Sequence, residues 1–156
     1  MELDRIDHAI LDHLQRDGRL SNVQLAGLVG LSESACLRRV RNLERSGLVE
    51  DYVMIVNQAA TGRPGNVFVR VTLESQKLED LRAFEEAVAD VPEVMECYLM
   101  SGDSDFLLRV IVRDATDYER IHHESLTSLP GVARVHSSFA LRTVLKKTAV
   151  PITAGT

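Results

Sequence analysis

The feature that most constrains this chain is a series of three short amphipathic segments within its first 46 residues. In residues 3–15, apolar side chains recur at steps of three and four residues, the spacing of one helix face, at Leu3, Ile6, Ile10 and Leu14. The dipeptide Asp17-Gly18 ends this helix. Ser21, with Gln24 three residues later, has the capping-box spacing that begins a second helix.

The pattern predicts a third helix over residues 33–46. Ser32 is a favourable N-cap, and Gly47 ends the helix. Three apolar positions are expected to face inward, at Cys36, Val40 and Leu43. Because only Gly30-Leu31-Ser32 separates this helix from the second one, the spacing indicates a helix-turn-helix.

The outer face of the third helix carries arginine, serine and asparagine with almost no lysine or glutamate. Arg and Asn can pair with base edges in the major groove, and Arg also neutralises phosphates. A solvated charged face is the alternative interpretation, but the helix-turn-helix spacing favours a recognition helix. We expect the DNA-binding residues to be Ser32, Ser34, Ala35, Arg38, Arg39, Arg41, Asn42 and Arg45.

Net charge at first argues against nucleic acid, because it is -5 at pH 7. Its distribution matters more, since four arginines fall within residues 38–45. A local basic face on an acidic protein binds DNA weakly through charge alone. We therefore expect base contacts or multivalent binding of double-stranded DNA.

The second half of the chain has a different periodicity. Strands are predicted over residues 66–74, 94–100, 106–112 and 132–144, and helices over residues 78–89 and 116–129. This βαββαβ order is that of a ferredoxin-like unit, so the fold class is α+β. The predicted domains are a helix-turn-helix over 1–52, a linker strand and loop over 53–65, and a ferredoxin-like domain with a C-terminal tail over 66–156.

A four-stranded sheet with two helices has one face that the helices do not cover. We expect that face to be apolar and to be buried by a second copy of the chain. Five residues are candidates for the two sides of the sheet, although periodicity does not assign each to a side: Val67, Val69, Val71, Leu107 and Val110.

Several classes of protein and site are not supported by the sequence. No apolar run approaches the ~20 residues of a membrane span, and no signal peptide is evident at residues 1–10. The two cysteines fit buried free thiols in a cytoplasmic protein. His122 and His123 point apart on a helix, so we expect no metal site and no cofactor. No nucleophile–base arrangement is evident, so we expect no enzyme and no catalytic residues.

Three segments of the sequence resemble the Lrp/AsnC (leucine-responsive, or feast/famine) transcription regulators. The resemblance is carried by LDRIDHAILDHLQRDGRLSNVQLAGLVGLSESACLRRVRNLERSGLVEDY, by PEVMECYLMSGDSDFLLRVIV and by LPGVARVHSSFALRTV. It covers about residues 2–152 and implies dimers that assemble further, commonly to octamers, and control genes of amino-acid metabolism. It also leaves open that Arg39 packs back on the first helix.

The turn Gly102-Asp103-Ser104-Asp105 is, on its residues alone, an ordinary hairpin turn. The resemblance implies that it lies in a pocket between protomers which holds an amino acid. An Asp carboxylate can pair with the ligand's ammonium group, and free backbone N–H groups can bind its carboxylate. The effector-binding residues that we expect are Met100, Gly102, Asp103, Asp105, His136, Ser138, Phe139 and Ala140, of which the apolar ones favour an aliphatic or small effector.

Two other functions compete with an amino-acid-responsive transcription regulator. A small metabolic enzyme built on the ferredoxin-like half would not need an arginine-faced helix. An architectural DNA-compacting protein would bind without sequence preference, and the acidic net charge disfavours it.

Overall fold

A computed structural model describes residues 2–152 of the chain. The chain divides into two compact units, which are described separately here. One contains the residues up to Ile55 together with those from Val144 onward, and the other is Val56–Thr143. The sequence placed the C-terminal tail with the ferredoxin-like domain, whereas here it groups with the N-terminal helices.

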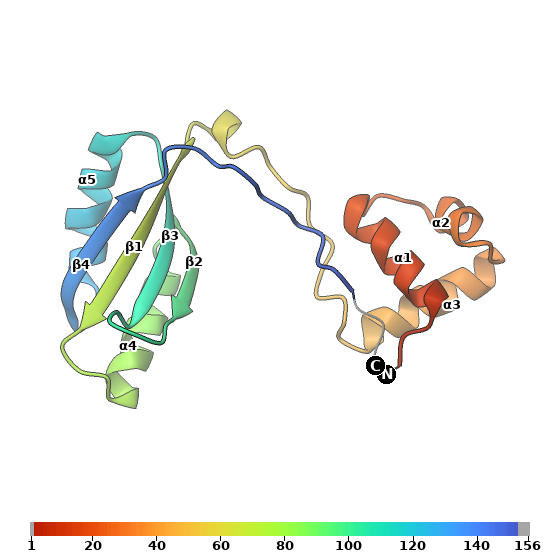
Figure 1. Ribbon diagram of the computed structural model, residues 1–156, viewed down its shortest axis with the longest axis horizontal. Helices are drawn as coiled ribbons and strands as arrows, with labels where there is room; N and C mark the ends of the chain where they lie inside the picture. The colour runs from red at the N-terminus through yellow and green to blue at the C-terminus, as the bar shows by residue number, and fades with distance from the viewer. Residues whose placement is uncertain (1, 153–156) are drawn as a thin grey trace. The chain divides into compact units, whose positions relative to one another are not determined.

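Three helices form the first unit: α1 (Arg5–Arg16), α2 (Asn22–Val29) and α3 (Glu33–Arg45) (Figure 1). Capping boxes begin α1 at Asp4 and α2 at Ser21. Gly30 ends α2 in the left-handed conformation, at φ 68°, which glycine adopts without steric cost. The core of this unit consists of Ile10, Leu11, Leu25, Ala26, Cys36 and Leu43.

The C-terminal segment completes the first unit. Ile152 packs against its core. The Gln15 side chain exchanges two hydrogen bonds with the backbone of Val150, because Gln15 Nε2 donates to Val150 O at 3.1 Å and Val150 N donates to Gln15 Oε1 at 2.6 Å. Residues 144–152 therefore belong structurally to the helix-turn-helix unit.

The second unit is a four-stranded antiparallel sheet with two helices, in the order β1 (Gly65–Leu73), α4 (Leu78–Ala89), β2 (Val94–Leu99), β3 (Phe106–Val112), α5 (Ala115–Glu124) and β4 (Val132–Phe139). Short 3-10 turns lie at Ala59–Thr61 and Leu126–Ser128. The strand order is β2-β3-β1-β4, which confirms the predicted ferredoxin-like α+β fold (Figure 1).

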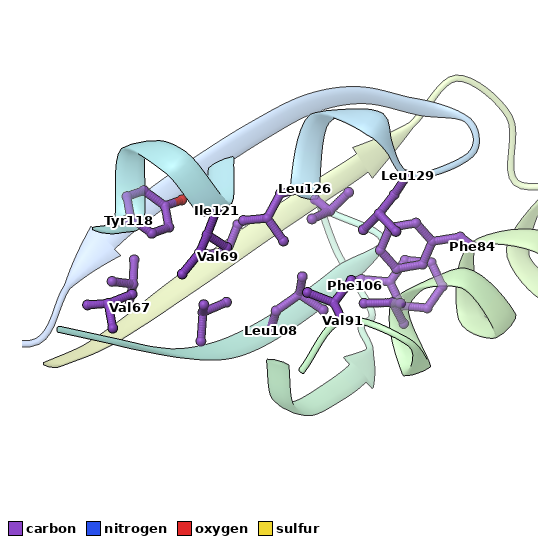
Figure 2. Packing of buried hydrophobic residues seen from close by; sticks show 14 of the residues in the cluster. Val67, Val69, Phe84, Val91, Phe106, Leu108, Tyr118, Ile121, Leu126 and Leu129 are labelled. Carbon is purple, nitrogen blue, oxygen red and sulfur yellow. The ribbon is translucent and has the colours of Figure 1, made fainter. Parts of the chain in front are cut away.

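Helices α4 and α5 cover one face of this sheet, and the core lies between the sheet and these two helices (Figure 2). Alternate residues of β1 and β3 point into it, including Val67, Val69 and Leu108, which are fully buried. Phe84 of α4 stacks on Phe106 of β3 with ring centroids 4.4 Å apart. The period-two pattern of the strands thus fixes which side faces the helices.

The opposite face of the sheet is mixed rather than apolar. Val67, Val69, Val71 and Val110 all face the helices, so of the five candidates only Leu107 lies on the uncovered face. Exposed aromatic residues Phe68 and Tyr98 share that face with Arg70 and Arg109. The expectation of a continuous apolar face was wrong, because the alternate positions of β1 carry Phe68, Arg70 and Thr72.

The largest differences from the predicted boundaries are in the last strand and in α5. The last strand ends at Phe139 rather than at residue 144, since the chain leaves the sheet after Ala140 N donates to Asn66 O at 2.9 Å. Helix α5 has its N-cap at Asp114, two residues before the predicted cap, because the Asp114 side chain accepts from Asp117 N, and it ends at Glu124 rather than at residue 129. Residues 51–57 belong to no helix or strand.

Candidate DNA-binding helix and ligand site

Helix α3 is anchored on one side and exposed on the other. Ser32 Oγ accepts from Ala35 N at 3.3 Å and so caps the helix. Cys36 and Leu43 are buried in the core of the unit. The predicted residues Ser34, Arg38, Arg41, Asn42 and Arg45 are exposed, and Ala35 is half-buried. The structure therefore presents these side chains on one helix, free of the core.

Arg39 differs from its neighbours. Its Nη1 lies 2.8 Å from Asp4 Oδ2 and 2.8 Å from Asp7 Oδ1, and only 29% of its side chain is exposed. The hydrogen bonds to Asp7 and Asp4 raise the pKa of Arg39 above its ordinary value. The pKa of Asp4 is lowered by the Asp7 N–H that it accepts and by Arg39. Arg39 therefore ties α3 to the start of α1 in this structure, which is the role that the sequence left open.

The remaining arginines of α3 are less constrained. Arg45 donates to Asn42 Oδ1 at 2.8 Å and to Arg41 O at 3.1 Å, along its own helix. The side chains of Arg38 and Arg41 make no ion pair within residues 2–152. Free guanidinium groups on an exposed helix can bind phosphates or base edges without first breaking an internal contact.

A cavity of about 330 Å³ opens at the 101–105 turn of the second unit. Its lining residues come from three segments, namely β1, the turn and β4: Arg70, Thr72, Asp103, Ser104, Arg134, Val135 and His136. Cross-strand pairing places Arg70 opposite His136 and Thr72 opposite Arg134 on the uncovered face. The cavity thus combines two guanidinium groups with one exposed carboxylate, that of Asp103.

The two aspartates of the turn have different surroundings. Asp105 Oδ2 accepts from Leu73 N at 2.7 Å, and Asp105 N donates to Val71 O at 2.9 Å. These bonds tie the turn to β1, so Asp105 shapes the turn. Asp103 is exposed and lines the cavity. Gly102 has φ 117°, which side-chain-bearing residues rarely adopt, so the turn requires glycine there.

The other predicted effector residues are distributed over both faces of the sheet. His136 lines the cavity, and Ser138, opposite Phe68, shares its face. Phe139 lies on the helix side, where its ring contacts Tyr118 edge-on at 5.2 Å between centroids. Met100 and Ala140 are not among the residues that line the cavity. The apolar residues on which the expectation of an aliphatic effector rested therefore do not line this cavity.

Sequence reasoning missed Arg70 and Arg134, the cations of this cavity. The signal was present in the alternation of the strands, since Arg70 follows Val69 and precedes Val71. A charged residue between two buried valines must point to the uncovered face. Pairing of β1 with β4 then brings Arg134 beside it, but that register cannot be obtained from periodicity alone.

A second charged cluster surrounds the buried carboxylate of Asp117 at the start of α5. Arg120 Nη2 lies 3.0 Å from Asp117 Oδ1 and 3.2 Å from Glu93 Oε1, and Arg113 N donates to Asp117 Oδ2 at 3.0 Å. The Arg113 N–H and the Arg120 and Arg113 guanidinium groups lower the pKa of Asp117 to about 2. These contacts hold α5 against the sheet.

Both cysteines are free thiols. Burial raises the pKa of Cys36, and burial together with the nearby Glu85 raises the pKa of Cys97 to about 11. No three His, Cys, Asp or Glu side chains in the described part of the chain converge as a metal site. None of the helices described here is long and apolar enough to cross a membrane.

Two family models match this sequence. The one described as "Winged helix-turn-helix DNA-binding" matches residues 3–50, and the one described as "Lrp/AsnC ligand binding domain" matches residues 66–150. The chain belongs to the Lrp/AsnC family. The predicted family is thus confirmed, and with it the interpretation as a DNA-binding transcription regulator rather than an enzyme.

Relatives within the Lrp/AsnC family match over most of their length. The Bkd operon transcriptional regulator of Pseudomonas aeruginosa is 44% identical over 151 residues, with 97% of this chain and 99% of the relative covered. The leucine-responsive regulatory protein of Escherichia coli K12 is 44% identical over 131 residues, with 84% of this chain and 80% of the relative covered.

Solved structures of Lrp/AsnC regulators have the same fold. The AsnC family transcriptional regulator of Agrobacterium tumefaciens is 36% identical, with a TM-score of 0.91 over 96% of this chain and 97% of that chain. A transcriptional regulator of Neisseria meningitidis in complex with L-Met is 34% identical, with a TM-score of 0.90 and 96% of each chain covered.

Proposed function

We propose that this Lrp/AsnC regulator binds DNA through α3 and responds to an amino acid that binds in the cavity at the 101–105 turn. The observation that carries the proposal is the set of charges in that cavity, where Arg70 and Arg134 lie with Asp103. The named relatives, a leucine-responsive protein and a regulator in complex with L-Met, support an amino-acid ligand.

The chemistry of an amino acid matches this set of charges. Its carboxylate needs a cation, and guanidinium groups bind carboxylates with two parallel hydrogen bonds. Its ammonium group needs a carboxylate, which Asp103 supplies, because Asp105 is occupied by the backbone of β1. Ser104 and Thr72 add hydroxyl groups, and His136 adds a ring nitrogen. A cavity with these groups and little apolar lining suits a small or polar side chain on the ligand.

The DNA-binding proposal assigns separate roles to the residues of α3. Arg38 and Arg41, with Asn42 beside them, are the side chains that we expect to reach bases or phosphates. Arg45 is the next cation along the helix, and Ser32 and Ser34 lie at the end of the helix where backbone N–H groups favour phosphates. Arg39 positions the helix against α1. The regulated genes that we propose are those of amino-acid metabolism, and the name of the leucine-responsive relative supports this.

We further propose that the chain works as a homodimer and in larger assemblies such as octamers. The uncovered sheet face supports this, because it leaves Phe68 and Tyr98 40% and 53% exposed. A second copy would bury these rings and place two recognition helices on neighbouring half-sites.

Thermal unfolding in the presence of each of the twenty amino acids tests the ligand site. A ligand at a hundred times its Kd stabilises the folded state by roughly 2.7 kcal/mol, which raises the melting temperature. We expect Asp103→Asn and Arg70→Ala to abolish or strongly reduce that rise. The matched controls are Asp90→Asn and Arg82→Ala, two exposed positions on or beside α4, away from the cavity.

The same experiment can overturn the proposal. If no amino acid shifts the unfolding of the wild-type protein, the chain does not sense amino acids through this unit. If a shift occurs and survives both Asp103→Asn and Arg70→Ala, the ligand binds elsewhere. In either case the assignment of α3 to DNA still stands and is tested separately.

A further inference from the structure

The helix-turn-helix unit is built from both ends of the chain. Residues 144–152 return to it after the last strand of the sheet, and Ile152 enters its core. Gln15, near the end of α1, binds this segment through both polar atoms of its side-chain amide. Its Nε2 donates to Val150 O, and its Oε1 accepts from Val150 N. The Gln15 amide thus makes the same pair of hydrogen bonds to Val150 that the backbone of a neighbouring strand would make.

The contact between residues 144–152 and the helices is not closely packed. A cavity of about 470 Å³ lies beside it, lined by three segments of the same unit: Leu11, Leu14 and Gln15 of α1, residues 48–52 after α3, and Thr148, Val150 and Ile152. Unfilled space means that the side chains around it lose packing contacts. The segment is therefore held at two points, Val150 and Ile152, rather than along its whole length, and such a contact is easier to release than a core.

The same segment is directly continuous with the proposed ligand cavity. Strand β4 carries Arg134 and His136 of that cavity and ends at Phe139. Only residues 140–143 separate it from Val144, the first residue that belongs to the helix-turn-helix unit. Four residues of backbone therefore connect β4 to the segment that Gln15 binds.

We propose that residues 144–152 form a strap that couples the ligand state of β4 to the recognition unit, with Gln15 and Ile152 as its anchors. This inference rests on the proposed amino-acid site, because the ligand is what changes β4. The chain then has two covalent connections between its units, at Ile55–Val56 and at Thr143–Val144, and the second is the shorter path from a strand that lines the cavity. Gln15 is a positioning residue, which acts on DNA binding through the strap.

Hydrogen exchange of the full-length protein tests the anchors without any ligand. We expect Gln15→Ala to speed exchange of peptides covering residues 145–152 at least tenfold, because Val150 N loses its acceptor. Ile152→Ala should have a similar effect. The control is Asp12→Ala, an exposed position on α1 whose only ion pair among residues 2–152 is with Arg16. Equal exchange of this segment in wild type and Gln15→Ala overturns the strap.

Coupling is tested with L-leucine and L-methionine as probes and with a DNA fragment that the wild-type protein selects from a random pool. The readout is the ratio of DNA affinity with and without the probe. We expect Gln15→Ala to lower this ratio at least fivefold toward one, while the probe still raises the melting temperature. A merely structural role of Gln15 would change affinity without changing the ratio.

The outcomes separate the strap from the proposed function. A Gln15→Ala protein with the wild-type ratio overturns the coupling and leaves the amino-acid site standing. If neither probe raises the melting temperature of the wild-type protein or changes its DNA affinity, there is no ligand signal to transmit, and the coupling is overturned. The hydrogen-exchange experiment then decides whether the strap exists.

Discussion

Two adjacent arginines on α3 have different surroundings. Arg39 is bound by Asp4 and Asp7, whereas Arg38 is exposed and makes no ion pair within residues 2–152. A helix turns by about 100° per residue, so neighbouring arginines face different surroundings. The sequence identified the set of arginines but not this division, because the partners of Arg39 are more than thirty positions away.

The two arginines therefore predict different effects when each is replaced by alanine. Arg38→Ala should weaken binding to the selected DNA by about 1–3 kcal/mol if it pairs with a base, with unchanged unfolding. Arg39→Ala should lower the melting temperature, because α3 loses its connection to α1. Binding isotherms and thermal unfolding of both variants check this. Equal melting temperatures for Arg39→Ala and wild type would show that the ion pairs contribute nothing.

Asp117 predicts a dependence of stability on acid. Its pKa is about 2 in the folded protein, below the ordinary 3.8. A carboxyl with a lowered pKa contributes stability that is fully present above pH 3.8 and is lost as the pH falls through 2. We expect Asp117→Asn to be less stable than wild type at neutral pH, and the difference to shrink between pH 3.8 and pH 2.

Urea unfolding at a series of pH values measures this difference. The control is Asp114→Asn, which removes an exposed negative charge beside α5, keeps a capping side chain, and leaves the buried carboxylate in place. A difference between Asp117→Asn and wild type that stays constant down to pH 2 would contradict the assignment of a low pKa to Asp117.

At the scale of elements, the order of helices and strands was predictable and their ends were not. Alternation and helical spacing gave βαββαβ because each element buries one face. The end of β4 depends on the last hydrogen bond to Asn66, and residues such as Val144 continue the apolar pattern beyond it. In the site, Asp103 and His136 line the same cavity as predicted, whereas Phe139 lies on the opposite face of the sheet, because adjacent strand residues alternate in direction.

The contact between α4 and the sheet includes an aromatic pair, packed beside Val88. Phe84 is fully buried and stacks on Phe106. Phe84→Ala should cost about 3–5 kcal/mol of unfolding free energy, because it leaves a cavity under α4. The exposed Leu78→Ala on the same helix serves as the control and should cost far less. Denaturant titration measures both, and a cost below that of Leu78→Ala would show that α4 does not depend on the pair.

The whole molecule is expected to assemble through the uncovered sheet face. Light scattering of the full-length chain should give a dimer or a larger assembly. Replacing Phe68 and Tyr98 together with aspartate should shift it toward the monomer, since buried carboxylates without partners are strongly unfavourable at an interface. Leu78→Asp, on the helix side, should leave the assembly unchanged. A double variant with the wild-type mass would place the interface elsewhere.

The course of the chain has a consequence for engineering. Because the first unit contains both ends of the chain, the ligand unit is an insertion within it, bounded by Ile55/Val56 and Thr143/Val144. A chimera that joins two regulators at one junction in the linker would pair the α1 of one parent with the C-terminal segment of the other. Exchanging Val56–Thr143 as a cassette keeps Gln15 with the Val150 that it binds. The ligand unit is then replaced while the helix-turn-helix unit stays intact.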